Sequence, residues 1–139
     1  MIYSALMKIF RLTDATAIPT DAKSFTGHVR SRRLAADEAA VPVHTYRVEF
    51  DIGARTHWHM HTGPQWLFVT EGRVRVQKWG EPVQDISAGD ALVIAPGEKH
   101  WHGAAPGVRA THLAVNVTAT TEWLEPVSDD QYLADTVSP

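Results

Sequence analysis

The feature that most constrains the fold is a series of short alternating segments, separated by turn-forming residues, between positions 43 and 117. The segments Val43–Phe50 and Arg73–Trp79 both change side-chain character at every second residue, which is the period of a β-strand. Turns containing Gly or Pro follow at positions 80–82, 96–97 and 105–107. Strands repeated at intervals of roughly 8–12 residues predict an all-β sandwich or small barrel, and they exclude a helical bundle.

The expected strands cover most of this region. In chain order they lie at residues 25–30, 43–50, 55–61, 65–70, 73–79, 83–86, 91–94, 99–103 and 108–117. We expect a tight hairpin turn at Glu71-Gly72, a buried strand at 91–94, and a loop or short helical turn at 31–40. Ser128 is expected to cap a short C-terminal helix. The residues expected to dock this helix against the sheets are Trp123, Leu124 and Tyr132.

Length and composition limit the class of protein. The chain has 139 residues, which is enough for one domain. We expect an N-terminal leader or first strand at 1–24 and a single barrel domain at 25–139. The net charge of -3 without a basic patch argues against nucleic acid as a partner. The apolar N-terminal run is too short for a membrane span and lacks the features of a cleaved signal, so we expect a cytoplasmic protein without a membrane partner.

The eight histidines are not evenly distributed. His57, His59 and His61 alternate within one expected strand, so a regular strand would place them on one face. A second pair, His100 and His102, has the same spacing some forty residues later. Two imidazoles at this spacing can bind one ion, and the absence of cysteine restricts a transition metal to nitrogen and oxygen ligands. The two stretches therefore predict a metal site between them.

The spacing around these histidines resembles the cupin superfamily. Gly53, His59, His61, Gln65 and Gly72 are separated by five, one, three and six residues, as in the first cupin motif, which has Glu in place of Gln65. The second motif corresponds to residues 89–104, where Gly97 and His100 are in place. Ala95 and Ala104 replace the Pro and Asn of that motif. The resemblance implies a double-stranded β-helix, a jelly-roll barrel, with the ligands His59, His61, Gln65 and His100.

A narrower resemblance extends over positions 25–132. The segments FTGHVR, GARTHWHMH, PGEKHWHGAAP, THLAV and EWLEPVSDDQY resemble a bacterial subgroup of small cupins that includes hydroxynitrile lyases and also has the Gln ligand. This resemblance implies one divalent transition metal, with manganese or iron favoured and nickel, zinc, cobalt and copper left open. It also implies a small-molecule substrate and a homodimer or higher homo-oligomer.

Gln65 changes the chemistry expected of such a site. Three neutral imidazoles and a neutral amide leave the charge of the site near +2, whereas a Glu ligand would leave it near +1. The bound ion is then a stronger Lewis acid and favours anions such as cyanide, a carboxylate or an enolate. An amide cannot accept a proton, so the base must be another residue. The candidates are His102, His112 and His57, each expected near the ligands through period-two spacing or a neighbouring strand.

Three functions fit these residues. The first is a metal-dependent lyase that cleaves a hydroxy compound such as a cyanohydrin, the second is a metal-dependent dioxygenase, and the third is a non-catalytic module that binds a small ligand. The remaining notable side chains have simpler interpretations. His28 and His44 are expected to be structural. The residues assigned to the barrel wall or outer face are Trp58, Trp66 and Trp101, and those assigned to a solvated strand face are Arg73, Arg75 and Lys78.

Overall fold

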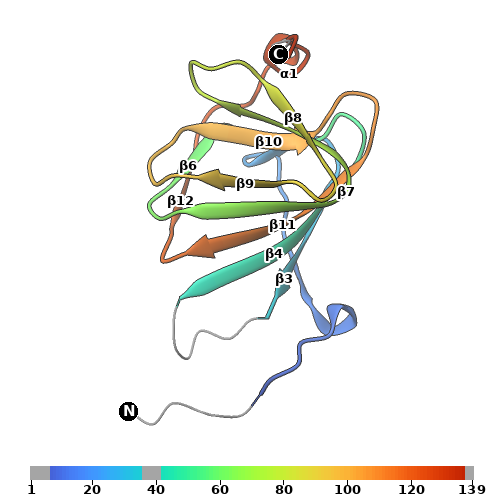
Figure 1. The fold of residues 1–139 in the computed structure, drawn as a ribbon, viewed down its shortest axis with the longest axis vertical. Helices are drawn as coiled ribbons and strands as arrows, with labels where there is room; N and C mark the ends of the chain where they lie inside the picture. Colours follow the sequence, from blue (N-terminus) through green and yellow to red (C-terminus); the bar gives the residue numbers. More distant parts are fainter. Residues whose placement is uncertain (1–6, 36–41, 137–139) are drawn as a thin grey trace.

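The computed structural model describes residues 7–35 and 42–136, which form antiparallel strands with two short helices (Figure 1). The elements are η1 (Leu12–Asp14), β1 (Thr16–Ile18), β2 (Phe25–Thr26), β3 (Val29–Leu34), β4 (Val43–Phe50), β5 (Arg55–Thr56), β6 (His59–His61), β7 (Gln65–Lys78), β8 (Gln84–Ser87), β9 (Ala91–Ile94), β10 (His100–Ala104), β11 (Ala110–Val117), β12 (Thr121–Trp123) and α1 (Asp129–Tyr132).

The strands follow the order β1-β3-β4-β11-β7-β10-β5-β2, and every pairing is antiparallel. Strands β8 and β9 pair with the two halves of β7, while β6 joins β10 to β12. The sheet curls so that one face is enclosed, and β3, β4 and β11 lie side by side along it (Figure 1). This architecture confirms the predicted all-β jelly-roll barrel with a short C-terminal helix.

Strand β7 is shared by the two halves of the barrel. Its first half pairs with β11 and β9, and its second half pairs with β10 and β8. The hairpin turn predicted at Glu71-Gly72 is therefore wrong, because the strand continues through it. Gly72 has φ 70°, and the register of β11 shifts between Thr111 and His112 opposite it. A Cβ on Gly72 would lie 1.9 Å from the carbonyl oxygen of Arg109, so glycine permits a bulge and not a reversal.

The strand predicted at 55–61 is divided into β5 and β6. Between them, the His57 N–H donates to the Ser24 carbonyl at 2.8 Å and the Trp58 N–H donates to the Glu125 carbonyl at 2.9 Å. The interruption shifts the inward face by one residue, because Thr56, His59 and His61 line the interior while His57 does not. The prediction that the three alternate histidines share one face is correct only for His59 and His61.

Other boundaries also differ from the sequence prediction. The strand expected at 25–30 is two strands, because Gly27 has φ 81° between β2 and β3. Strand β3 then continues to Leu34, where a loop or helical turn was expected, and 36–40 lies outside the described residues. Strand β9 is not a buried strand, since only Ile94 among its residues is buried. Within the stretch 1–24, β1 pairs with β3.

The interior contains two main apolar clusters. One lies within the barrel and includes Val48, Phe50 and Val74. The other lies beneath α1, where Trp58 and Trp101 pack with Val83, Val127 and Tyr132. Ser128 caps α1, as predicted, and the cap is a capping box in which the Ser128 side chain accepts from the Gln131 N–H at 3.1 Å. Burial of these aromatic surfaces stabilises the packing of the C-terminal segment against the barrel.

Arg75 has a structural role that the sequence interpretation missed. Its side chain is buried, forms two hydrogen bonds with Asp85, and donates from Nη1 to the carbonyl oxygens of Tyr132 and Ala134. The assignment of Arg75 to a solvated strand face is therefore wrong, whereas Arg73 and Lys78 are exposed. A planar guanidinium with several donors suits this position because it satisfies a carboxylate and the end of α1 together.

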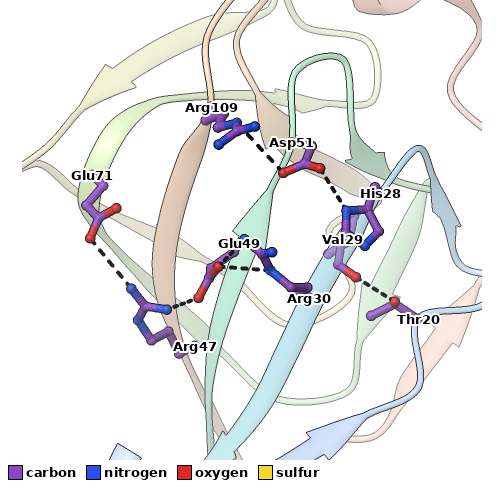
Figure 2. Close-up of polar contacts among 9 residues, drawn as sticks. All are labelled: Thr20, His28, Val29, Arg30, Arg47, Glu49, Asp51, Glu71 and Arg109. Atoms are coloured by element: carbon purple, nitrogen blue, oxygen red, sulfur yellow. Dashed lines mark hydrogen bonds and ion pairs between the residues drawn. The ribbon is translucent and has the colours of Figure 1, made fainter.

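Charged side chains of β3, β4 and the adjoining loops, together with Glu71 of β7, form a ladder on the outside of the barrel (Figure 2). Arg30 and Arg47 both pair with Glu49, and Asp51 accepts from His28 at 2.7 Å and lies 3.9 Å from Arg109. His28 thus has the structural role expected for it. Exposed pairs of this kind contribute about 0–1 kcal/mol each, so they add little to the stability of the fold. Among residues 7–35 and 42–136, no helix has the length and apolar character needed to cross a bilayer.

Candidate metal centre

Three histidines from two paired strands meet inside the barrel. His59 and His61 belong to β6, and His100 belongs to β10, directly opposite His59 in the register. One ring nitrogen from each of the three lies within 4.8 Å of the others. Since the common transition metals bind imidazole nitrogen at about 2.0–2.1 Å, a single ion between the three rings is compatible with this spacing.

The outer nitrogen of each ring has a defined partner. His59 donates from Nδ1 to the His57 carbonyl, and His100 donates from Nδ1 to the Glu98 carbonyl, both at 2.8 Å. His61 Nδ1 pairs with Thr121 Oγ1 at 2.8 Å. These contacts direct the Nε2 atoms of the three rings inward. A protonated Nδ1 leaves an unprotonated Nε2, which is the form that binds a metal.

Gln65 enters the same region from the start of β7. Its Nε2 donates to Asn116 Oδ1 at 2.8 Å, so the Asn116 contact uses the amide nitrogen and not the amide oxygen Oε1. That oxygen and the Nε2 atoms of His61 and His100 are buried without a hydrogen-bond partner among the described residues. Buried polar atoms without a partner are destabilising, and several of them facing one point fit a bound cation. The residues therefore fit a divalent metal ion with three nitrogen ligands and one oxygen ligand.

Burial keeps the histidines of the centre neutral. Removal from water lowers the pKa of His59 well below its usual value of 6.5, and it lowers the pKa of His100 to about 4. The pKa of His61 is lowered as well, again chiefly because of burial. A neutral imidazole retains the lone pair that a metal requires, so the site is prepared for binding near neutral pH.

A second pair of histidines lies beside the candidate ligands. His102 Nδ1 and His112 Nε2 are 3.0 Å apart, so one of them donates a proton to the other. The outer nitrogens, His102 Nε2 and His112 Nδ1, are buried without a described partner. The His102 ring lies 5.3 Å from that of His59, measured between centroids. Burial lowers the pKa of His102 well below its usual value and that of His112 to about 4. Both rings are therefore neutral near pH 7, and the ring that donates within the pair keeps a lone pair on its outer nitrogen.

A cavity of about 280 Å³ opens onto these groups. Its polar side contains His59, His61 and Gln65 together with the pair His102 and His112. The remaining wall comes from separate parts of the chain. Its apolar side chains are Ile18, Pro19, Phe25, Tyr46, Val48, Ala114 and Trp123, and its polar side chains are Asp21, Ser24, Ser31, Thr56, Asn116 and Thr121. A cavity that combines apolar walls with convergent polar groups is typical of a small-molecule site.

The structure brings six of the seven predicted site residues together. His59, His61, Gln65, His100, His102 and His112 surround one region, whereas His57 does not line the cavity and contributes its carbonyl to His59. The sequence interpretation did not find the contribution of β12. Trp123, expected to dock the C-terminal helix, instead lies against His59 with ring centroids 4.6 Å apart. The spacing of Thr121 and Trp123, two residues apart, was the available signal for a short strand with one face inward.

A curled antiparallel barrel with an internal histidine cluster defines a class of small metal-binding barrels. The cupin domain family matches residues 46–116, which is half of the chain, and this protein belongs to the cupin family. The matched region contains all four candidate ligands and the His102–His112 pair. The N-terminal segment and β12, which complete the cavity wall, lie outside it.

Individual relatives agree with this assignment. The chain is 40% identical over 129 residues to an (R)-mandelonitrile lyase of Granulicella tundricola, with 91% of this chain and 98% of the relative covered. A cupin-like protein of Thermotoga maritima has a similar structure, with a TM-score of 0.78, 38% identity, and 81% and 88% of the two chains covered. A polyketide cyclase of Streptomyces resistomycificus has a TM-score of 0.70 over 91% of each chain at 23% identity, which shows a shared fold.

Proposed function

We propose that this protein is a metal-dependent lyase that cleaves a hydroxy nitrile, a cyanohydrin, into a carbonyl compound and cyanide. The observation that carries the proposal is the His102–His112 pair, which places unpaired ring nitrogens in the same cavity as a fitting metal site. Identity of 40% to a mandelonitrile lyase over nearly the whole of both chains supports the substrate class.

In this proposal His59, His61, His100 and Gln65 hold one divalent ion, with manganese or iron favoured. All four side chains are neutral when they bind, so the ligands do not reduce the ionic charge. A divalent ion in this set would supply Lewis acidity that favours ionisation of a hydroxyl group and the departure of cyanide as an anion. The absence of a carboxylate ligand also weakens retention of the metal, particularly of hard ions.

The histidine pair supplies the proton transfer. If His102 Nδ1 donates to His112 Nε2, then His102 Nε2 carries a lone pair and can take the hydroxyl proton of the substrate. The C–C bond to the nitrile carbon then breaks, its electron pair leaves with cyanide, and the carbonyl forms. Protonated His102 can return the proton to cyanide, or pass the shared proton to His112. The pair thus provides both a base and an acid while the total number of protons is conserved.

The apolar wall orients the organic part of the substrate. Phe25 and Trp123 form an aromatic pair with ring centroids 5.4 Å apart, and both line the cavity together with Tyr46. Apolar and aromatic surfaces favour a hydrocarbon substituent, and the histidines at the polar side favour the hydroxyl and nitrile groups. The substrate is thereby held with its reacting groups toward His102.

The test is a mandelonitrile cleavage assay on protein loaded with Mn²⁺ and, separately, with Fe²⁺. We expect benzaldehyde release with one of the metals, and a decrease of about 100-fold or more in kcat for His112→Ala and His102→Ala. His28→Ala is the matched control, because His28 is exposed on the outer face. Benzaldehyde release no faster than in buffer, with both enantiomers and both metals, would contradict the proposal.

The same assay separates the lyase from the other two functions. A lyase reaction does not consume oxygen, so anaerobic turnover should equal aerobic turnover. Loss of turnover without oxygen would instead indicate a dioxygenase. Saturable binding of a hydroxy nitrile without cleavage would indicate a binding module.

A further inference from the structure

The four candidate ligands are supported in two ways. His59 and His100 donate to backbone carbonyls, which can only accept, so the orientation of these rings is determined by the backbone itself. Gln65 depends on a side chain, because its Nε2 donates to Asn116 Oδ1. The amide of Gln65 differs from an imidazole in a further respect: one end accepts hydrogen bonds and the other end donates them.

This difference makes the direction of the amide decisive. Rotation about the last side-chain torsion of Gln is broad and roughly two-fold, so the torsion itself does not select one direction. With Oε1 inward, a lone pair faces the ion. With the NH₂ group inward, two partly positive hydrogens face it and binding is opposed. A Glu at this position has two equivalent oxygens and presents an acceptor in either direction.

We infer that Asn116 is a positioning residue that holds the Gln65 amide with its oxygen toward the metal. Asn116 lies directly opposite Gln65 in the register of β11 and β7, so the sheet fixes the distance between the two side chains. Only 3% of Gln65 and 9% of Asn116 is exposed, so water competes weakly for the contact. The inference rests on the metal site of the proposed function, and it concerns affinity for the ion, apart from any reaction.

The test measures the dissociation constant for Mn²⁺, by the electron paramagnetic resonance of the free ion, in wild type, Asn116→Leu and Asn116→Asp. Leu matches the size of Asn without an acceptor, and we expect Mn²⁺ to bind about 10-fold more weakly or worse. Asp keeps the acceptor, so Asn116→Asp should bind at least as tightly as wild type. Melting temperatures of the metal-free proteins show whether the fold is intact. If Asn116→Asp loses as much affinity as Asn116→Leu, or Asn116→Leu loses none, the inference is wrong.

A second arm distinguishes orientation of the amide from packing. In the Gln65→Glu background, Asn116→Leu should weaken Mn²⁺ binding by a clearly smaller factor, because a carboxylate does not need to be oriented. An equal loss in both backgrounds would assign Asn116 a packing role and overturn the inference. Absence of Mn²⁺ binding by the wild-type protein would instead contradict the metal site itself, so the two failures are distinguishable.

Discussion

Two of the candidate ligands, His59 and His100, are oriented by backbone carbonyls, and we call them backbone-supported. The other two, His61 and Gln65, are oriented by side chains, and we call them side-chain-supported. The carbonyl that supports His59 belongs to His57, and the carbonyl that supports His100 belongs to Glu98, so each support lies two residues before its ligand. His61 and Gln65 rely on residues 60 and 51 positions away. The first kind of support is local to the motif, whereas the second requires the completed fold.

This difference suggests where the site can be adjusted. A backbone carbonyl at position i−2 remains when the side chain that carries it is replaced. Thr121 and Asn116 can be changed by a single substitution, and both line the cavity. The outer partners of metal ligands influence affinity by about 10–100-fold, so the side-chain-supported half is where small sequence changes should alter metal binding.

The largest effect is expected from removing a backbone-supported ligand. His100→Ala should weaken Mn²⁺ binding by at least about 100-fold, because losing a ligand exceeds the loss of its outer partner. Equilibrium dialysis with elemental analysis measures the change. The control is His28→Ala, whose side chain contacts Asp51 on the outer face. Binding by His100→Ala within a few-fold of wild type would remove His100 from the ligand set.

The local and non-local supports also explain how much the sequence could predict. The fold class followed from the period-two segments and their turns, and the capped helix followed from Ser128. The grouping of His59, His61 and His100 followed from spacing, because these residues lie in two short strands that the fold pairs directly. Such features depend on a few neighbouring residues, which is the range over which a pattern is informative.

The errors arose where distant segments decide the local structure. The strand at 55–61 is interrupted because Ser24 and Glu125 supply backbone partners to His57 and Trp58. Gly72 lies at a bulge because the register of β11 and β7 shifts there, although the dipeptide Glu71-Gly72 alone is typical of a turn. The alternating pattern assigns Arg75 to an exposed face, but the C-terminal segment covers it. None of these contacts can be read from a window of ten residues.

The next largest effect is expected from burial, which the backbone-supported and side-chain-supported ligands have in common. His112 has a pKa near 4 in the folded protein against about 6.5 when exposed, so the unfolded chain binds more protons between these values. The contribution of neutral His112 to the free energy of unfolding should therefore be fully present above about pH 6.5 and should decrease as the pH falls toward 4. The other buried histidines act in the same direction.

We expect the melting temperature of the metal-free protein to fall by roughly 10 °C between pH 7 and pH 5. Differential scanning calorimetry after chelation measures the change, and Mn²⁺ at pH 7 should raise the melting temperature. His112→Gln should reduce the dependence on pH, because it removes one of the buried titrating groups. A melting temperature that is constant between pH 7 and pH 5 would be inconsistent with neutral buried histidines.

A smaller effect is expected from the side-chain support of His61. Thr121→Val removes the hydroxyl that pairs with His61 Nδ1 but keeps the shape of the side chain. Mn²⁺ binding should weaken by about 10-fold, and Thr121→Ser should restore it. Thr120→Val is the matched control, since the Thr120 hydroxyl contacts Thr62 outside the cavity. Equal losses in Thr121→Val and Thr121→Ser would show that the methyl group, and not the hydroxyl, is important.

The smallest effect is expected where an aromatic ring contacts a ligand that the backbone already orients. Trp123 lies against His59 with centroids 4.6 Å apart, yet the His57 carbonyl determines the direction of that ring. Trp123→Leu should therefore weaken Mn²⁺ binding by only about 2-fold, corresponding to about 0.5 kcal/mol for a lost aromatic contact. Because Trp123 also lines the cavity, the same variant should raise the KM for an aromatic cyanohydrin more than it changes metal affinity. A loss of Mn²⁺ affinity as large as that of Thr121→Val would mean that a backbone carbonyl does not by itself orient a ligand, and the distinction between the two halves of the site would not hold.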